Sequence, residues 1–194
     1  MSFAEYVERV ADEVVGAFPA DAGIYAVTFR IDSVDQDPRL PYVAIGYTTE
    51  ADAARSAQQA QQASDGWETR WSYAYFPGTG LEGVRAVGRD PEGAEAHRRE
   101  AESRGLRYED DEEPDGRDDL LIEWFHEVCV GAARRLHLSG RIVEALGRPT
   151  PVILYDMFEP DAMFELTSAA NPAELVADFM REDPAESLAP GSRE

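Results

Sequence analysis

The strongest constraint on the fold is the change in the spacing of apolar residues along the chain. Residues 3–18 carry apolar side chains three and four apart, which predicts an amphipathic helix that Pro19 ends. Ser2 and Glu5 match a capping box at its start. From Ile24 to Ile31 the apolar residues alternate, which predicts a strand. The chain therefore begins as a helix followed by a strand.

The same reasoning predicts the later elements. We expect further strands at Tyr42–Tyr47, Arg70–Phe76, Pro151–Met157 and Met163–Thr167. We expect helices at Glu50–Ala63, Pro91–Arg104, Asp118–His137, Ser139–Leu146 and after Asn171-Pro172. This order lacks the regular alternation of a doubly wound parallel sheet. The expected fold is α+β, with a four- or five-stranded, mostly antiparallel sheet packed by helices.

The length of 194 residues is typical of one domain. We expect a single α+β domain over residues 1–181 and a flexible polar tail over residues 182–194. Residues 77–117 combine glycines with a run of acidic residues. We interpret them as an acidic, Gly-rich insertion between the third and fourth strands, mobile or lid-like, with one charged helix.

The charge of the chain limits its partners. The sequence has 39 acidic and 18 basic residues, a net charge of −21, and every basic residue is arginine. Without lysine there is no P-loop lysine and no Schiff-base chemistry. Because phosphate binding needs clustered cations, nucleic acid and anionic membrane are excluded as partners, and a basic protein is favoured.

The densest acidic stretch spans residues 109 to 119. One interpretation is a solvated flexible loop, and the other is a docking surface for a cationic partner. The sequence supports the two about equally. The candidate partner-binding carboxylates are Glu109, Asp110, Asp111, Glu112, Glu113, Asp115, Asp118 and Asp119.

Cysteine usage and the first residues indicate the compartment. Cys129 is the only cysteine, so neither a disulfide framework nor a cysteine zinc site can form within the chain. The first ten residues do not resemble a signal peptide, and no apolar run is long enough to span a bilayer. We expect a cytoplasmic protein.

Candidate catalytic groups are few. His126 and Cys129 lie three residues apart on one predicted helix, so they could be neighbours. Cys129 borders an apolar stripe, however, and a buried structural cysteine is the common case. His97, His126 and His137 lack the spacing of metal ligands, and we expect them at the surface or at helix ends.

Three carboxylates follow the apolar strand at 151–157. Asp156, Glu159 and Asp161 could hold a hard cation or supply a base, although a solvated turn around Pro160 is the more common meaning. The glycines between 78 and 88 match no phosphate-binding loop. We therefore assign no catalytic residue, no cofactor and no metal site.

Four aromatic residues cluster near the predicted third strand. Trp71, Tyr73 and Tyr75 alternate, which favours a place in the core. Trp67 precedes the strand and is expected to be the most exposed of the group. It is the candidate aromatic anchor for a partner.

Several segments are similar to one family. IYAVTFRI, WETRWSYAYF, PVILYDM and FELTSAANPAELVADF together resemble the bacterial Domain of Unknown Function 4303 family. The resemblance covers most of residues 3–180, and Trp71, Asp156, Asn171 and Pro172 occupy its landmarks. In that family a leucine precedes the Asn-Pro step, whereas Ala170 stands here.

The resemblance implies a binding function. Members are small cytoplasmic bacterial proteins, and some are thought to neutralise toxins of interbacterial competition systems. We therefore expect a non-catalytic, immunity-type protein that neutralises a basic toxin or another cationic protein. The alternatives are a metal-dependent enzyme using carboxylates near Asp156, or an inhibitor that mimics nucleic acid.

Overall fold

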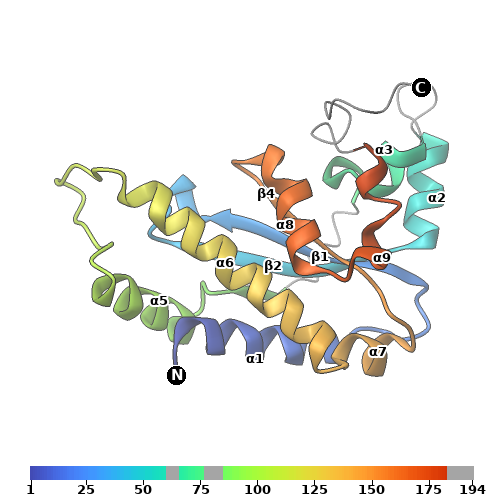
Figure 1. Ribbon diagram of the computed structural model, residues 1–194, viewed down its shortest axis with the longest axis horizontal. Coiled ribbons are helices and arrows are strands. Elements are labelled where there is room, and N and C mark those ends of the chain that lie inside the picture. The colour runs from blue at the N-terminus through green and yellow to red at the C-terminus, as the bar shows by residue number, and fades with distance from the viewer. Residues whose placement is uncertain (60–65, 77–84, 183–194) are drawn as a thin grey trace.

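The computed structural model describes residues 1–59, 66–76 and 85–182. They form an α+β fold around one sheet with strand order β3-β2-β1-β4 (Figure 1). β1 pairs antiparallel with β2 and parallel with β4, and β2 pairs antiparallel with the three-residue β3. The strand bounds are β1 Ile24–Ser33, β2 Pro41–Thr49, β3 Arg85–Val87 and β4 Val152–Asp156.

The helices account for most of the remaining described residues. The main ones are α1 Phe3–Gly16, α2 Glu50–Gln59, α3 Gly66–Trp71, α5 Pro91–Ser103, α6 Arg117–Leu138, α7 Arg141–Leu146, α8 Met163–Ala170 and α9 Ala173–Val176. Short 3-10 turns occur at Val34–Gln36, Tyr73–Tyr75, Pro160–Ala162 and Met180–Glu182. The expected capping box of Ser2 and Glu5 is present at the start of α1.

The α+β class is confirmed, but the mostly antiparallel sheet is wrong because β4 is parallel to β1. The strand expected at Arg70–Phe76 is also wrong, since this segment is the end of α3 and a 3-10 turn. Its aromatics pack against different elements: Trp71 meets the Tyr25 ring, and Tyr73 stacks on Tyr155. Their alternation therefore reflects separate tertiary contacts and not a strand.

The strand expected at Met163–Thr167 is wrong too, because this segment belongs to α8. Its side chains occupy the edge of β4 where another strand would pair. The Thr167 hydroxyl accepts a bond from the Leu154 amide at 3.0 Å and donates one to the Leu154 carbonyl at 3.1 Å. Asn171 accepts from the Val152 amide and donates to its carbonyl, both at 2.7 Å. These side chains satisfy the edge of β4 in place of a strand.

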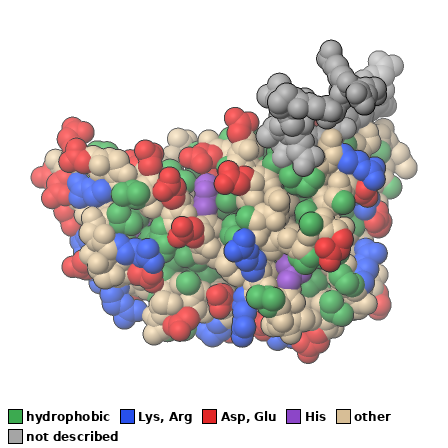
Figure 2. Space-filling view, viewed as in Figure 1, with side chains coloured by type: hydrophobic (Ala, Val, Ile, Leu, Met, Phe, Trp, Pro, Cys, Tyr) green, Lys and Arg blue, Asp and Glu red, His purple; other side chains and the backbone are tan. Residues whose placement is uncertain are grey.

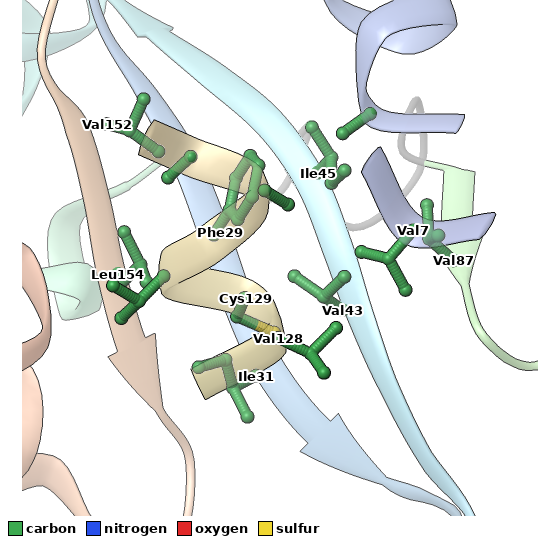
Figure 3. Packing of buried hydrophobic residues seen from close by; sticks show 14 of the residues in the cluster. Val7, Phe29, Ile31, Val43, Ile45, Val87, Val128, Cys129, Val152 and Leu154 are labelled. Atoms are coloured by element: carbon green, nitrogen blue, oxygen red, sulfur yellow. The ribbon is translucent and has the colours of Figure 1, made fainter. Parts of the chain in front are cut away.

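Helices α1 and α6 cover one face of the sheet. Val128 and Cys129 of α6 face the apolar residues of the strands, and Val7 of α1 lies beside Val87 (Figure 3). The strand residues of this layer are Phe29, Ile31, Val43, Ile45, Val152 and Leu154. The other face has its own apolar cluster, in which Tyr25, Ile153 and Tyr155 pack with Trp71, Val176 and Phe179.

The described part of the expected insertion contributes to this core. β3 adds to the edge of the sheet, and α5 packs on α1 with Ala96, His97 and Ala101 buried. Asp90 caps α5 by accepting the amide of Gly93 at 3.2 Å. Residues 77–84 of the expected insertion and 183–194 of the expected tail lie outside the described residues. Within the described ranges, no helix has the length and apolar character needed to cross a membrane.

The contact between α5 and α1 leads to a stability prediction. A Cβ at Gly93 would lie 2.6 Å from Cε1 of Tyr6 and 2.8 Å from Cα of Gly88. Gly93→Ala should therefore lower the free energy of unfolding by about 1–3 kcal/mol through overpacking. At Gly131 in α6 a Cβ meets nothing within 4 Å, so Gly131→Ala should raise that free energy by up to about 1 kcal/mol. Urea unfolding measures both, and equal effects would contradict the packing argument.

Candidate functional site

The acidic loop, residues 107–116 between α5 and α6, is held by a cluster of two arginines and one tyrosine. The guanidinium groups of Arg39 and Arg117 lie 4.7 and 4.8 Å from the centre of the Tyr108 ring. The Tyr108 hydroxyl donates to the Asp118 carboxylate in the first turn of α6. Burial, followed by this hydrogen bond, raises the pKa of Tyr108 to about 12. The hydroxyl therefore stays a donor at physiological pH.

Arg117 also fixes the backbone of the acidic loop. Its guanidinium donates to the carbonyls of Arg107 at 2.9 Å, Glu113 at 2.6 Å and Pro114 at 2.9 Å. Arg39 donates to the carbonyl of Tyr108 at 3.3 Å. The loop is thus pinned at both ends by charged donors, whose hydrogen bonds are stronger than neutral ones.

Three of the expected partner-binding carboxylates already have arginine partners. Arg39 binds Asp110 at 2.8 Å, Arg107 binds Glu109 at 2.7 Å, and Arg117 lies 3.6 Å from Glu112. The Asp118 carboxylate instead accepts the hydrogen bond of the Tyr108 hydroxyl. Asp110 remains largely open, with 92% of its side chain exposed.

The other four carboxylates of the predicted set are exposed and have no cationic partner among the described residues. They are Asp111, Glu113, Asp115 and Asp119. Figure 2 shows acidic side chains gathered at the end of the molecule where α5, α6 and the loop between them lie. The structure therefore places the predicted acidic residues on the acidic loop and on the first turn of α6 that follows it.

Trp67 does not belong to this surface. It is the second residue of α3, which lies at the opposite end of the molecule from the acidic loop (Figure 1). Its indole N–H donates to the Phe179 carbonyl at 2.8 Å, and its ring stacks on Phe164 at 5.8 Å. Trp67 is half-buried in the second core cluster whereas Tyr73 is exposed, so the expectation that Trp67 is the most exposed of the four aromatics is wrong.

A second polar group lies where the parallel strands end. Nε2 of His126, on α6, is 2.7 Å from Oδ2 of Asp156, the last residue of β4. Oδ1 of Asp156 accepts the amides of Phe158 at 2.7 Å and Glu159 at 3.2 Å. Both carboxylate oxygens are therefore occupied, and Asp156 orients the imidazole. The expectation of a surface position for His126 is wrong, since its side chain is 12% exposed.

This pair borders a cavity of about 220 Å³, which Ser33 and Glu159 also line. A hydrogen-bonded His–Asp pair is the arrangement that general-base catalysis uses. The thiol of Cys129 takes no part in such chemistry, because burial raises its pKa and disfavours the thiolate. Among the described residues no three metal-binding side chains group together, and Asp161 is exposed on its 3-10 turn.

A larger cavity of about 700 Å³ lies between the loop that follows β1, helix α5 and the start of the acidic loop. It adjoins the smaller cavity, since Pro41 and Leu121 line both. His97 forms part of its wall and is 4% exposed, so the expected surface position is wrong here too. The His97 ring stacks on Trp124 at 4.9 Å and meets the edge of Phe3 at 5.0 Å.

The third histidine also has a partner. Nε2 of His137 lies 2.9 Å from Oδ1 of Asn171, near the end of α6. Burial lowers its pKa. His137 is thus at a helix end, as expected, and links α6 to the segment that seals the edge of β4.

Comparisons of the chain with family models, with curated proteins and with solved structures found no match. The family resemblance therefore remains an interpretation of the quoted segments.

Asp156 should be important for stability. Asp156→Ala removes the acceptor of two backbone amides and of His126, so it should lower the free energy of unfolding by about 2–4 kcal/mol. Asp161→Ala, five residues later and exposed, should change it by less than about 0.5 kcal/mol. Chemical denaturation compares the two, and similar losses would show that the contacts of Asp156 contribute little to stability.

His97 should make stability depend on pH. Burial lowers its pKa from 6.5 to about 4, so the folded state binds a proton more weakly than the unfolded state. Its stabilising contribution is complete above pH 6.5 and is lost as pH falls towards 4, by up to about 3 kcal/mol. In His97→Phe, which keeps the ring contacts, the fall between these pH values should be smaller by that amount. Parallel slopes in denaturation series of the two proteins would refute this.

Proposed function

We propose that this protein binds a basic protein partner through the acidic loop. The observation that supports the proposal is a group of four exposed carboxylates without a cationic partner among the described residues, three on a loop that Arg39 and Arg117 hold in place and Asp119 in the first turn of α6. Because these carboxylates are fixed in position, they present a constant negative potential to the partner. No ordering of the loop is then required when the complex forms.

The net charge of −21 adds a long-range attraction to this local one. Electrostatic steering raises association rates, and its effect falls as salt screens the charges. The partner is expected to present arginine or lysine side chains to the loop. An acidic or nucleic-acid partner would be repelled.

The narrower form of the proposal is an immunity-type role, in which the partner is a basic toxin. It rests on the family resemblance of the sequence together with the charge. The metal-dependent alternative lacks support, because Asp156 is committed to His126 and to backbone amides. Mimicry of nucleic acid is less favoured, since the acidic residues from 109 to 119 cluster in one loop and the helix turn that follows it and do not repeat along one face.

The test uses two variants of equal net charge. The loop variant Asp111→Asn/Glu113→Gln/Asp115→Asn removes three unpaired carboxylates and leaves the arginine contacts in place. Asparagine suits position 115, where φ is +50°. The control Glu127→Gln/Glu165→Gln/Glu174→Gln removes three exposed carboxylates from α6, α8 and α9.

Partners are captured from the native host with the wild-type protein, and association rates are then measured at low and physiological salt. The loop variant should associate about tenfold more slowly at low salt, with a flatter salt dependence, and the control should resemble the wild type. If both variants slow association equally, the net charge of the protein sets the association rate and the acidic loop has no special role. Unchanged rates in both would refute the proposal.

A further inference from the structure

The small cavity lies where the two parallel strands end. Its wall consists of residues that end or follow β1, among them Ser33 and Gln36, of Asp156 and Phe158 at the end of β4, and of one face of α6. In α/β proteins, ligands bind in the crevice outside the carboxyl ends of parallel strands. The parallel pairing of β1 with β4 gives this cavity the same position.

Asp156 determines where the His126 ring carries its proton. Oδ1 of Asp156 accepts the amides of Phe158 and Glu159, and Oδ2 lies 2.7 Å from Nε2 of His126. An ionised carboxylate only accepts hydrogen bonds, so Nε2 donates and Nδ1 of the neutral ring keeps a lone pair. A lone pair held in this way is that of a general base.

Nδ1 of His126 is open to solvent. It makes no hydrogen bond with the described residues. In this part of the chain, the buried side-chain atoms that lack a hydrogen bond are Nε2 of His97 and Nε of Arg141, and Nδ1 of His126 is not among them. Because His126 lines the small cavity and its side chain is 12% exposed, its basic nitrogen is accessible to a molecule bound there.

Ser33 points to the face of the sheet that carries His126. Ile31 faces α6 (Figure 3), and in an extended strand residues two apart share a face. Ser33 is extended, with φ −141° and ψ 153°. Asp156 is the register partner of Ile31, so Ser33 and Asp156 lie on neighbouring strands at the edge of the sheet where α6 presents His126. The Ser33 hydroxyl makes no hydrogen bond with the described residues.

We propose that Ser33, His126 and Asp156 form a catalytic site that hydrolyses small, uncharged esters. Ser33 is the nucleophile, His126 is the general base, and Asp156 is the positioning residue that fixes the tautomer of His126. A nucleophile, a base and an orienting group in one cavity are the set that acyl transfer requires. The acidic loop, which the structure describes in full, does not line this cavity, so the activity is separate from partner binding.

The reaction proceeds through an acyl group on Ser33. Nδ1 of His126 takes the proton of the Ser33 hydroxyl while Oγ forms a bond with the carbonyl carbon of the ester. The C–O bond to the alcohol then breaks, and the alcohol leaves with the proton that His126 held. Water adds to the acyl group, His126 takes one of its protons and returns it to Oγ, and the carboxylic acid leaves. The carboxamide of Gln36, which also lines the cavity, is available to donate to the oxyanion of both intermediates.

The walls of the cavity limit the acyl group. A volume of about 220 Å³ is smaller than the roughly 300–1,000 Å³ of drug-sized pockets, so the acyl chain is short. Leu121, Ile122 and Phe125 supply apolar contacts for it. Among the described residues no arginine lines the cavity, whereas Glu159 does, so a substrate with a carboxylate or phosphate is disfavoured.

Chromogenic esters test the activity and its range. The full chain should hydrolyse 4-nitrophenyl acetate and butyrate with a kcat/KM at least about tenfold above that for the decanoate, whose chain exceeds the cavity. Mono-4-nitrophenyl succinate has a chain similar to that of the butyrate but ends in a carboxylate. It should react about tenfold more slowly than the butyrate.

Variants and a covalent label assign the roles. Ser33→Ala and His126→Gln should each lower kcat/KM for the butyrate at least about a hundredfold. The control Ser103→Ala removes an exposed hydroxyl of α5 outside the cavity and should keep the wild-type rate. Diisopropyl fluorophosphate, an uncharged probe, should lose fluoride to Oγ of Ser33 in the wild-type chain, and mass spectrometry locates the adduct.

Asp156→Asn tests the positioning role. Its amide oxygen still accepts the two backbone amides, but its NH₂ group faces Nε2, so the proton of the ring moves to Nδ1. The value of kcat should fall about a hundredfold or more, with KM little changed. Nitrogen-15 NMR should report Nε2–H of His126 in the wild type and Nδ1–H in the variant, whereas a purely structural role would leave the tautomer unchanged.

Three results would overturn the assignment. They are hydrolysis of the short esters no faster than in buffer, a loss of rate in Ser33→Ala no larger than in Ser103→Ala, and absence of the label from Ser33. The label is measured on the wild-type chain, so it decides the assignment even where a variant fails to fold.

Discussion

The parallel pairing of β1 with β4 is the constraint on which the rest of the structure depends. Parallel neighbours need a long crossover, and here the chain between β2 and β4 supplies α5, α6 and α7. Helix α6 can then cover the face that carries Phe29 and Leu154. β1 gains hydrogen-bonded neighbours on both edges and apolar cover on both faces. Displacing β4 would expose the apolar clusters on both faces of the sheet at once.

The same pairing positions the polar groups. Ile31 pairs with Asp156, so the ends of β1 and β4 meet at one edge of the sheet. There α6 brings His126 to the Asp156 carboxylate, and the loop that follows β1 forms a wall of both cavities. The same loop supplies Arg39, which reaches the acidic loop. The His126–Asp156 contact, the two cavities and the charged surface are therefore neighbours because of one strand register.

Much of the local structure could be predicted from the sequence, because its signals are local. The apolar spacing and the capping box predict α1, and Asp90 with Pro91 predicts the start of α5. The segment Met163–Thr167, which was expected to be a strand, belongs to a helix with its own periodic signal, since Met163, Leu166 and Ala170 lie three and four residues apart. That spacing favoured a helix over a strand.

Contacts between distant residues could not be predicted in this way. His126 and Asp156 are thirty residues apart, and only the parallel pairing makes them partners. His97 belongs to a helix whose sequence is mostly charged, and its burial against Trp124 depends on how α5 meets α6. The acidic residues of the loop are evident in the sequence, but the sequence does not show which of them pair with arginine. Which carboxylates are paired depends on where the fold places Arg39 and Arg117.

The use of arginine to hold the acidic loop has a consequence for alkaline solutions. A guanidinium keeps its proton at any pH that a folded protein survives, whereas an ammonium group begins to lose its charge near pH 10. The contacts of Arg117 with three backbone carbonyls therefore persist in base. The shape of the loop is therefore insensitive to alkali until Tyr108 ionises.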